Sequence, residues 1–544
     1  MTRSNRILWA AALLLLLQFA LRAYQIDALP AYGDESLHIR RAEVAWQFTT
    51  DPTASYRPGK LLLYYYMGLF ETTRTDFLLV GRLSVALATL MGGAALFALG
   101  RRLFNAQAGL LALFLYAVTP FTLFFDRMAL ADPLAMALML VAVWASFKWL
   151  DRPDPARTAL ATVFLILAPV AKLTVGLVVA VPALLVLLFR REVWRAYLRP
   201  GVMLFGVFGA VWAVLFSPVV IGELSPRDED RVVIVGDYLL NVHEEEQGFL
   251  ENLLDSAATA FEQTAIYIWA PVLLLSGLGL LWLLRMRPRA GLFLLAAWLL
   301  MWVPVVALGS FPRSRYLEVS MPFVYLMLVG GASDALSRIR EPERRVTFAR
   351  AWVAGLLLYG LAWGGPFFYQ AVTEPADLPL PEADRWRYVS AHTAAYGQIE
   401  AVNYMQAELP RAEASGQVQA WGMLGSCHMI RLYLAEPGPV DFTCTSFDYT
   451  RQFPPAELAA IEADAARYET GVYLLVERAM LFEFDLEENF GFVAPTNAGE
   501  LAVTWEHVRD FTRPHDGVTI ELWRLTPPPP GQARFAFPTH PQEP

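Results

Sequence analysis

Long apolar runs recur along the first two thirds of the chain and are its strongest pattern. Most are close to the roughly 20 residues that a helix needs to cross a bilayer. Eleven such runs can be placed, the shortest being 158–171: 7–23, 78–100, 107–125, 130–149, 158–171, 174–189, 202–221, 265–284, 291–309, 316–333 and 350–369. The pattern predicts a polytopic α-helical membrane protein with about eleven transmembrane helices.

Charges are sorted between alternate connections. With the N-terminus inside, every inside connection is basic: Arg101 and Arg102; Lys148, Arg152 and Arg157; Arg190, Arg191, Arg195 and Arg199; Arg285, Arg287 and Arg289; Arg338, Arg340, Arg344, Arg345 and Arg350. The opposite loop 222–262 carries eleven acidic residues against Arg227 and Arg231. Because Lys and Arg accumulate in short cytoplasmic loops, we expect a multi-pass protein of the plasma membrane with a cytoplasmic N-terminus.

Composition agrees with this interpretation. Of 544 residues, 56% are hydrophobic and 17% are charged, which is too apolar for a soluble enzyme. Run 7–23 follows Arg3 and Arg6, but no small-residue cleavage site comes after it, so we expect a retained helix rather than a signal peptide. The formal net charge of -9 gives no support for a nucleic-acid partner.

Two regions interrupt the apolar pattern. In the outer loop 24–77, residues 36–48 have the spacing of an amphipathic helix on the membrane surface, capped by Asp34. Residues 56–70 form a second apolar element in that loop. The tail 371–525 mixes a helical stretch, 398–409, with four strand-like runs, 417–423, 471–477, 500–511 and 518–525.

The domain plan is therefore a membrane domain over 1–370, a C-terminal α/β domain over 371–525 outside the membrane, and a disordered tail over 526–544. Both cysteines, Cys427 and Cys444, lie in the C-terminal domain. An oxidising compartment would favour a disulfide between them. Two buried thiols are the alternative.

Asp34 and Glu35 follow the first apolar run, with His38 one helical turn beyond Asp34. A carboxylate here could act as a general base toward a hydroxyl, or bind a divalent cation with His38. Capping of a helix is the simpler alternative.

Asp132 begins the fourth apolar run, where a carboxylate needs a partner or a function. It too could serve as a cap, before Pro133. Asp126 and Arg127 are expected to be interfacial charges or a local ion pair.

Cations at the outer boundary run against the charge pattern and need an explanation. They are Lys60, Arg57, Lys172, Arg313 and Arg315. Binding a lipid phosphate is one explanation, because Arg and Lys are the usual phosphate ligands. Snorkelling to headgroups is the other, and it suits Arg57 better than Lys172.

The order of several short motifs resembles glycosyltransferase family 39 and its relatives in the C-type glycosyltransferase superfamily, which include protein O-mannosyltransferases and lipid A aminoarabinose transferases. The resemblance covers about 1–370. Its pieces are Gly33-Asp34-Glu35-Ser36-Leu37-His38, Arg57-Pro58-Gly59-Lys60-Leu61, Gly81-Arg82-Leu83-Ser84, Arg127 to Pro133, Ala171-Lys172-Leu173-Thr174, and Arg315-Tyr316-Leu317 with Pro322. Pro58-Gly59 departs from the Pro-Pro common in the family.

The resemblance implies an inverting transferase that takes a sugar from a polyprenyl-phosphate donor. Asp34 would be the base, with Glu35 shaping the catalytic site or holding a metal. Lys172, Arg315, Lys60, Arg313 and Tyr316 would bind the donor phosphate, while Asp132 and His38 would support the site or hold a metal. The superfamily varies in its need for a divalent cation, so a metal cofactor stays open.

Partners implied by the resemblance are the lipid-linked donor, membrane lipid, and a protein, lipid or glycan acceptor. The sequence does not name the sugar or the acceptor. A transporter or flippase of lipid-linked sugars is the main alternative, although transport favours charges near the midplane and internal repeats, and neither is evident here. A ligase or a transferase of another group is a second alternative.

Overall fold

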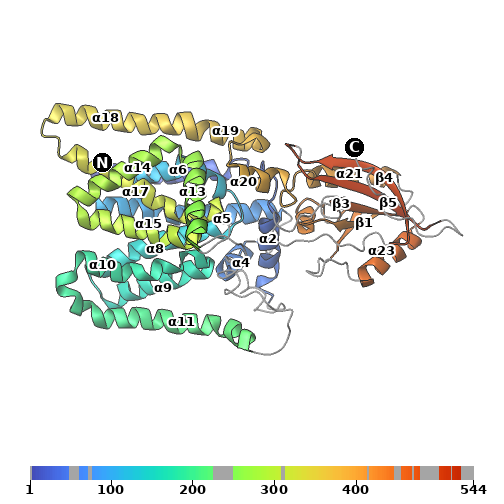
Figure 1. Cartoon of the computed structure of the whole chain (residues 1–544), viewed down its shortest axis with the longest axis horizontal. Coiled ribbons are helices and arrows are strands. Elements are labelled where there is room, and N and C mark those ends of the chain that lie inside the picture. Colours follow the sequence, from blue (N-terminus) through green and yellow to red (C-terminus); the bar gives the residue numbers. More distant parts are fainter. Residues whose placement is uncertain are drawn as a thin grey trace. The chain divides into compact units, whose positions relative to one another are not determined.

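The computed structural model describes residues 3–47, 60–70, 76–224, 249–307, 313–412, 416–435, 437–445, 455–468, 471–477, 501–515 and 517–528. Two compact units make up the chain (Figure 1). The first contains Met1–Ala28 and His38–Pro381, and the second contains Leu29–Leu37 and Glu382–Pro544. The second unit thus recruits a short segment from the start of the chain, which the predicted division at residue 370 did not include.

Helices build the first unit. They are α1 (Arg3–Ala23), α2 (Gly33–Ala45), α4 (Leu61–Gly68), α5 (Phe77–Leu103), α6 (Ala106–Val118), α7 (Pro120–Phe125), α8 (Ala131–Asp151), α9 (Pro155–Ala171), η1 (Leu173–Ala180), α10 (Val181–Phe189), η2 (Arg191–Tyr197), α11 (Leu198–Leu224), α13 (Phe249–Ile268), α14 (Ala270–Met286), α15 (Pro288–Ala307), α16 (Ser314–Leu317), η4 (Glu318–Ser320), α17 (Met321–Ser337), α18 (Pro342–Tyr359), η5 (Gly360–Gly364), α19 (Gly365–Thr373) and η6 (Pro375–Asp377). Helix α2 begins in the second unit and continues into the first.

The predicted membrane architecture is confirmed. Within the described ranges, seven helices are long and apolar enough to cross a bilayer, and the bent pair α13–α14 could form an eighth crossing. Three shorter apolar helices, 106–118, 155–171 and 173–189, occupy further predicted runs. Length alone does not make these three spanning, so the count of eleven stays a prediction.

One predicted boundary changes at the acidic outer loop. Residues 249–262 belong to α13, whereas the sequence pattern placed them in the acidic outer loop. Their acidic side chains sit on an amphipathic helix, which hides its apolar face from a run-based search. Helix α13 then meets α14 at a bend of 110°. Trp269 forms that bend with a positive φ of 74°, and its ring stacks on Trp363.

Small residues let α5, α6 and α8 pack closely together. Gly92 of α5 lies so close to Ala137 of α8 that a Cβ there would meet the Ala137 Cα at 3.1 Å. Gly100 similarly approaches Gly109 of α6. Helix α8 is buried along almost its entire length. Such close backbone approach fixes the helices that carry the polar side chains described below.

The second unit is a mixed five-stranded sheet between helices, which confirms the predicted C-terminal α/β domain (Figure 1). Its strands are β1 (Val418–Met423), β2 (Val440–Cys444), β3 (Val472–Glu477), β4 (Thr504–Thr512) and β5 (Thr519–Thr526), in the order β2-β1-β3-β5-β4. Its helices are α20 (Glu382–Arg385), η7 (Trp386–Ser390), α21 (Gln398–Ala407), α22 (Leu409–Ala412), η8 (Cys427–Leu432) and α23 (Pro455–Arg467).

Pairing is parallel for β1 with β2 and β3, and antiparallel for β5 with β3 and β4. Helices α21 and α23 pack on opposite faces, through Met405 and Ile461 among others. Strands β1 and β3 are therefore buried on both faces. The four predicted strands are present, and β2 and α23 are additions. The predicted disordered tail 526–544 begins with the last residue of β5, and 529–544 lie outside the described residues.

Candidate functional site

A buried ion pair joins the start of α8 to the break between α9 and η1. Lys172 Nζ donates to Asp132 Oδ1 at 2.5 Å, and both residues are almost fully buried. Helix α8 has Leu130 at its N-cap position and no side-chain cap, so capping does not explain Asp132. Lys172 points into the protein rather than toward headgroups. Both simple alternatives considered for these residues are therefore wrong.

Tyr316 lies at the centre of the neighbouring cations. Lys172 Nζ is 3.8 Å from the centroid of its ring, and the guanidinium carbons of Arg315 and Arg313 are 5.0 and 6.0 Å away. Arg315 Nη2 also donates to the Tyr316 hydroxyl at 3.2 Å. The short helix α16, which carries Arg315 and Tyr316, is fixed by Ser314, whose hydroxyl donates to Gln263 Oε1 at 2.9 Å. The ring thereby holds like charges close together through cation–π contacts.

His38 connects a fourth cation to this group. Its Nδ1 lies 2.9 Å from the Ala129 carbonyl oxygen, which only accepts hydrogen bonds, so Nδ1 carries the proton. Nε2 then accepts from Lys60 Nζ at 2.8 Å. Neutral His38 thus orients the Lys60 ammonium group. Lys60, like Lys172, acts electrostatically on Tyr316.

We call His38, Lys60, Asp132, Lys172, Arg313, Arg315 and Tyr316 the Tyr316 cluster; all belong to the first unit. It brings four cations together, of which Lys172 and Arg315 are buried and Lys60 and Arg313 are half-buried. Such a group can bind a phosphate or another compact anion, with Arg forks and Lys point charges as donors. Arg57 lies outside the described residues.

Asp34 and Glu35 belong to the second unit, in the first turn of α2. Because the helix begins at Gly33, the predicted cap at Asp34 is wrong. Glu35 performs that task instead: its Oε2 accepts from the Tyr32 backbone N–H at 2.9 Å, one half of a capping box. Glu35 is fully buried, whereas Asp34 is half-buried.

Asp126 and Arg127 do not pair with each other. Asp126 Oδ2 accepts from Arg22 Nε at 3.0 Å, and both side chains are fully buried. Arg127 donates to the carbonyls of Leu21, Tyr24 and Gln25 at 2.6–2.9 Å, where α1 ends. Burial lowers the pKa of Arg127 to about 10, which leaves it charged at neutral pH. The predicted local ion pair is corrected to two separate structural contacts.

The donor set does not fit a metal ion within the described part of the chain, where no three His, Cys, Asp or Glu side chains form a group able to hold one. The predicted supporting ligands are engaged otherwise, His38 by Lys60 and Asp132 by Lys172. No chemical step is therefore derived through a metal.

Glu318 was not predicted. It is fully buried in η4, directly after α16, and interacts electrostatically with Asp126 and Asp132. The available signal was an acidic residue at the start of an apolar run, next to Arg315 and Tyr316. Glu318 extends the polar interior from the Arg22–Asp126 pair toward the Tyr316 cluster.

The family resemblance is supported by comparison with known proteins. Residues 59–221 match the family described as dolichyl-phosphate-mannose-protein mannosyltransferase. The matched stretch includes Lys60, Asp132 and Lys172 but neither Asp34 nor Arg315. No curated protein matches the sequence significantly.

Solved structures show the same fold. ArnT from Cupriavidus metallidurans in the apo state is 13% identical with a TM-score of 0.54, and ArnT bound to undecaprenyl phosphate is 14% identical with a TM-score of 0.52. In both comparisons 96% of this chain and 98% of the other are covered. The apo oligosaccharyltransferase of Archaeoglobus fulgidus is 14% identical with a TM-score of 0.52, covering 88% of this chain and 70% of that one. At such low identity, these likenesses define the fold.

Proposed function

We propose that this chain, a multi-pass membrane protein with the fold of the C-type glycosyltransferases, moves a sugar from a polyprenyl-phosphate donor to an acceptor on the non-cytoplasmic side. The observation that carries the proposal is the Tyr316 cluster, in which Lys60, Lys172, Arg313 and Arg315 gather around one tyrosine ring. Four cations gathered inside a membrane protein need a function, and binding an anionic ligand supplies one.

The Tyr316 cluster would bind the donor phosphate. One protein of the same fold is ArnT, seen bound to undecaprenyl phosphate. When the bond from the anomeric carbon to the phosphate oxygen breaks, negative charge grows on the leaving phosphate. Lys172 and Arg315 would stabilise that charge without reorganising, because Asp132 and Tyr316 already hold them in position.

Asp34 would act as the general base. It takes the proton from the acceptor hydroxyl as the acceptor oxygen bonds to the anomeric carbon and the phosphate leaves from the opposite face, which inverts the configuration. The buried contact of Glu35 with the backbone supports this division of labour. Glu35 would hold the turn, and Asp34 would take the acceptor proton.

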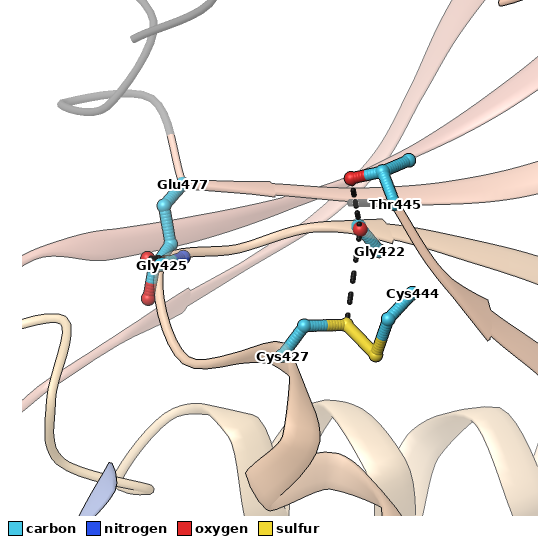
Figure 2. The surroundings of a disulfide bond; sticks show 6 residues. All are labelled: Gly422, Gly425, Cys427, Cys444, Thr445 and Glu477. Carbon is cyan, nitrogen blue, oxygen red and sulfur yellow. Dashed lines mark hydrogen bonds between the residues drawn. A yellow bond between two sulfur atoms is a disulfide. The ribbon is translucent and has the colours of Figure 1, made fainter. Parts of the chain in front are cut away.

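The charge pattern of the connections supports a cytoplasmic N-terminus and an outside C-terminal domain in the plasma membrane. The disulfide between Cys427 and Cys444 adds a second argument, since disulfides persist in oxidising compartments (Figure 2). The acceptor class stays open among protein, lipid and glycan. For the oligosaccharyltransferase of the same fold, structures exist with a tethered acceptor peptide and with Zn and sulfate.

Asp34→Asn tests the proposal. We expect transfer to fall by about 10²- to 10⁴-fold, the usual contribution of a general base, with donor binding unchanged. Asp27→Asn, at an exposed acidic position soon after α1, is the control and should keep full activity. Full activity of Asp34→Asn would remove Asp34 from its role. Movement of intact lipid-linked sugar across vesicles, without transfer, would favour a flippase instead.

A second test addresses the donor. Lys172→Ala should raise the donor concentration needed for half-maximal rate by about 10- to 100-fold, since a lost charged hydrogen bond weakens binding by roughly 1.5–3 kcal/mol. Lys148→Ala removes an exposed cation from the other end of α8 and should leave donor dependence unchanged. An unchanged donor requirement in Lys172→Ala would contradict phosphate binding by the Tyr316 cluster.

A further inference from the structure

The segment 29–37, which carries Asp34, is built into the C-terminal sheet domain. Tyr32 forms an antiparallel β-bridge with Ala394. Gly33 N donates to the Thr393 carbonyl at 2.8 Å, and Ala395 N donates to the Ala31 carbonyl at 3.0 Å. The Ala31 N–H donates to the Tyr433 hydroxyl at 2.6 Å. Together, these hydrogen bonds fix the position at which α2 begins.

The segment around Ala394, the bridge partner of Tyr32, is held in turn by a buried ion pair. Arg513, directly after β4, donates through Nε to the Ala394 carbonyl at 3.0 Å and through Nη1 to the Val518 carbonyl at 3.0 Å. Its Nη2 pairs with Glu477 at the end of β3, and both side chains are fully buried. The strand ends of the sheet are therefore linked to the residue opposite Tyr32.

Glu477 also reaches a loop that touches the Asp34 segment. Its Oε2 accepts from Gly425 N at 2.9 Å, and Cys427, two residues later, bonds to Cys444 of β2 (Figure 2). Ser426 lies between these two anchors. A Cβ added to Gly33 would come within 2.8 Å of Ser426 Oγ and 3.6 Å of the Thr393 carbonyl. An alanine at position 33 would therefore force the Ser426 hydroxyl out of its present place.

We infer that the C-terminal domain positions Asp34 for catalysis, with Arg513, Glu477 and the Cys427–Cys444 disulfide as the parts that hold segment 29–37. The inference rests on the proposed role of Asp34 as base. It assigns the domain a part in the chemical step in addition to any contact with the acceptor. These residues are positioning residues, since each acts through the backbone that carries Asp34.

The sharpest test introduces a steric clash at Gly33 and then removes it with a second substitution at Ser426. Gly33→Ala should lower turnover by about 10- to 100-fold, because displacement of a catalytic group by about 1 Å is that costly, while donor affinity stays unchanged. Ser426→Ala removes the obstructing Oγ and should itself be neutral. The double variant Gly33→Ala with Ser426→Ala should recover most of the turnover.

Hydrogen exchange in the full-length protein gives a readout independent of activity. The amides of Gly33 and Ala395 should exchange faster in Gly33→Ala and in Arg513→Gln, and return to the wild-type rate in the double variant. Reduction of the disulfide should accelerate exchange in the same segment. If wild-type protein transfers no sugar, the proposed function fails while exchange still reports on the positioning. Normal turnover and wild-type exchange in Arg513→Gln, or no recovery of turnover in the double variant, would overturn the inference.

Discussion

Lys172 shows how a single residue can be located by sequence and explained only by structure. A cation inside an apolar run is visible in the sequence, and so is Asp132, forty positions earlier. Their pairing at 2.5 Å depends on how α8 and α9 pack, which no local pattern encodes. The same holds for Arg22 and Asp126, whose contact replaced the predicted pairing of Asp126 with Arg127. Charged positions were predictable, and partners were not.

The Asp132–Lys172 pair makes a stability prediction. Removing one member, as in Lys172→Met, leaves the other charge buried and should destabilise the protein by about 3–5 kcal/mol. The double variant Asp132→Asn with Lys172→Met should be closer to wild type, because no lone charge remains. Thermal unfolding in detergent measures both. Equal melting temperatures for Lys172→Met and wild type would contradict the predicted loss of stability when Asp132 is left without Lys172.

At the scale of elements, the apolar runs predicted the membrane helices well because a helix in lipid must be apolar over most of its length. The first part of the amphipathic helix α13 was not predicted, since only one of its faces is apolar. In the sheet, β1 and β3 were recognisable as apolar runs, whereas β2 has alternating exposure and few residues. The cap of α2 was shifted by one residue because local signals do not separate Asp34 from Glu35 as the capping group.

Helix packing between α14 and α17 depends on Gly279 of α14. A Cβ on Gly279 would meet the Met327 carbonyl oxygen at 2.5 Å, whereas a Cβ on Gly277 would meet nothing within 4 Å. Gly279→Ala should therefore destabilise the protein by about 1–3 kcal/mol through overpacking. Gly277→Ala, on the same helix, should be neutral or slightly stabilising. Comparison of their melting temperatures checks this, and equal values would contradict the predicted contact.

At the scale of the whole molecule, the division into a membrane unit and a sheet unit followed from composition. The assignment of residues 29–37 to the second unit did not, because those residues adjoin a membrane helix in the sequence. Their membership depends on backbone hydrogen bonds to residues 393–395, more than 350 positions away. Long-range backbone pairing of this kind leaves no trace in hydrophobic periodicity.

Orientation is open to direct measurement. Arg344, with an exposed side chain at the start of α18, is predicted inside, and Glu457 of α23, which is partly exposed, is predicted outside. In right-side-out vesicles, a membrane-impermeant maleimide should label Glu457→Cys at once and Arg344→Cys only after permeabilisation. The native cysteines form a disulfide and should not react with the maleimide. The reverse labelling pattern would invert the topology.

The central claim is transfer of a sugar from a polyprenyl-phosphate donor. It is tested most directly by mass spectrometry of lipid-linked sugars and glycans in cells that lack the protein, complemented with wild type or with Asp34→Asn. We predict that one polyprenyl-phosphate sugar accumulates and one glycan disappears without the protein, that wild type reverses both changes, and that Asp34→Asn reverses neither. Unchanged lipid-linked sugars and glycans in cells lacking the protein would contradict the claim.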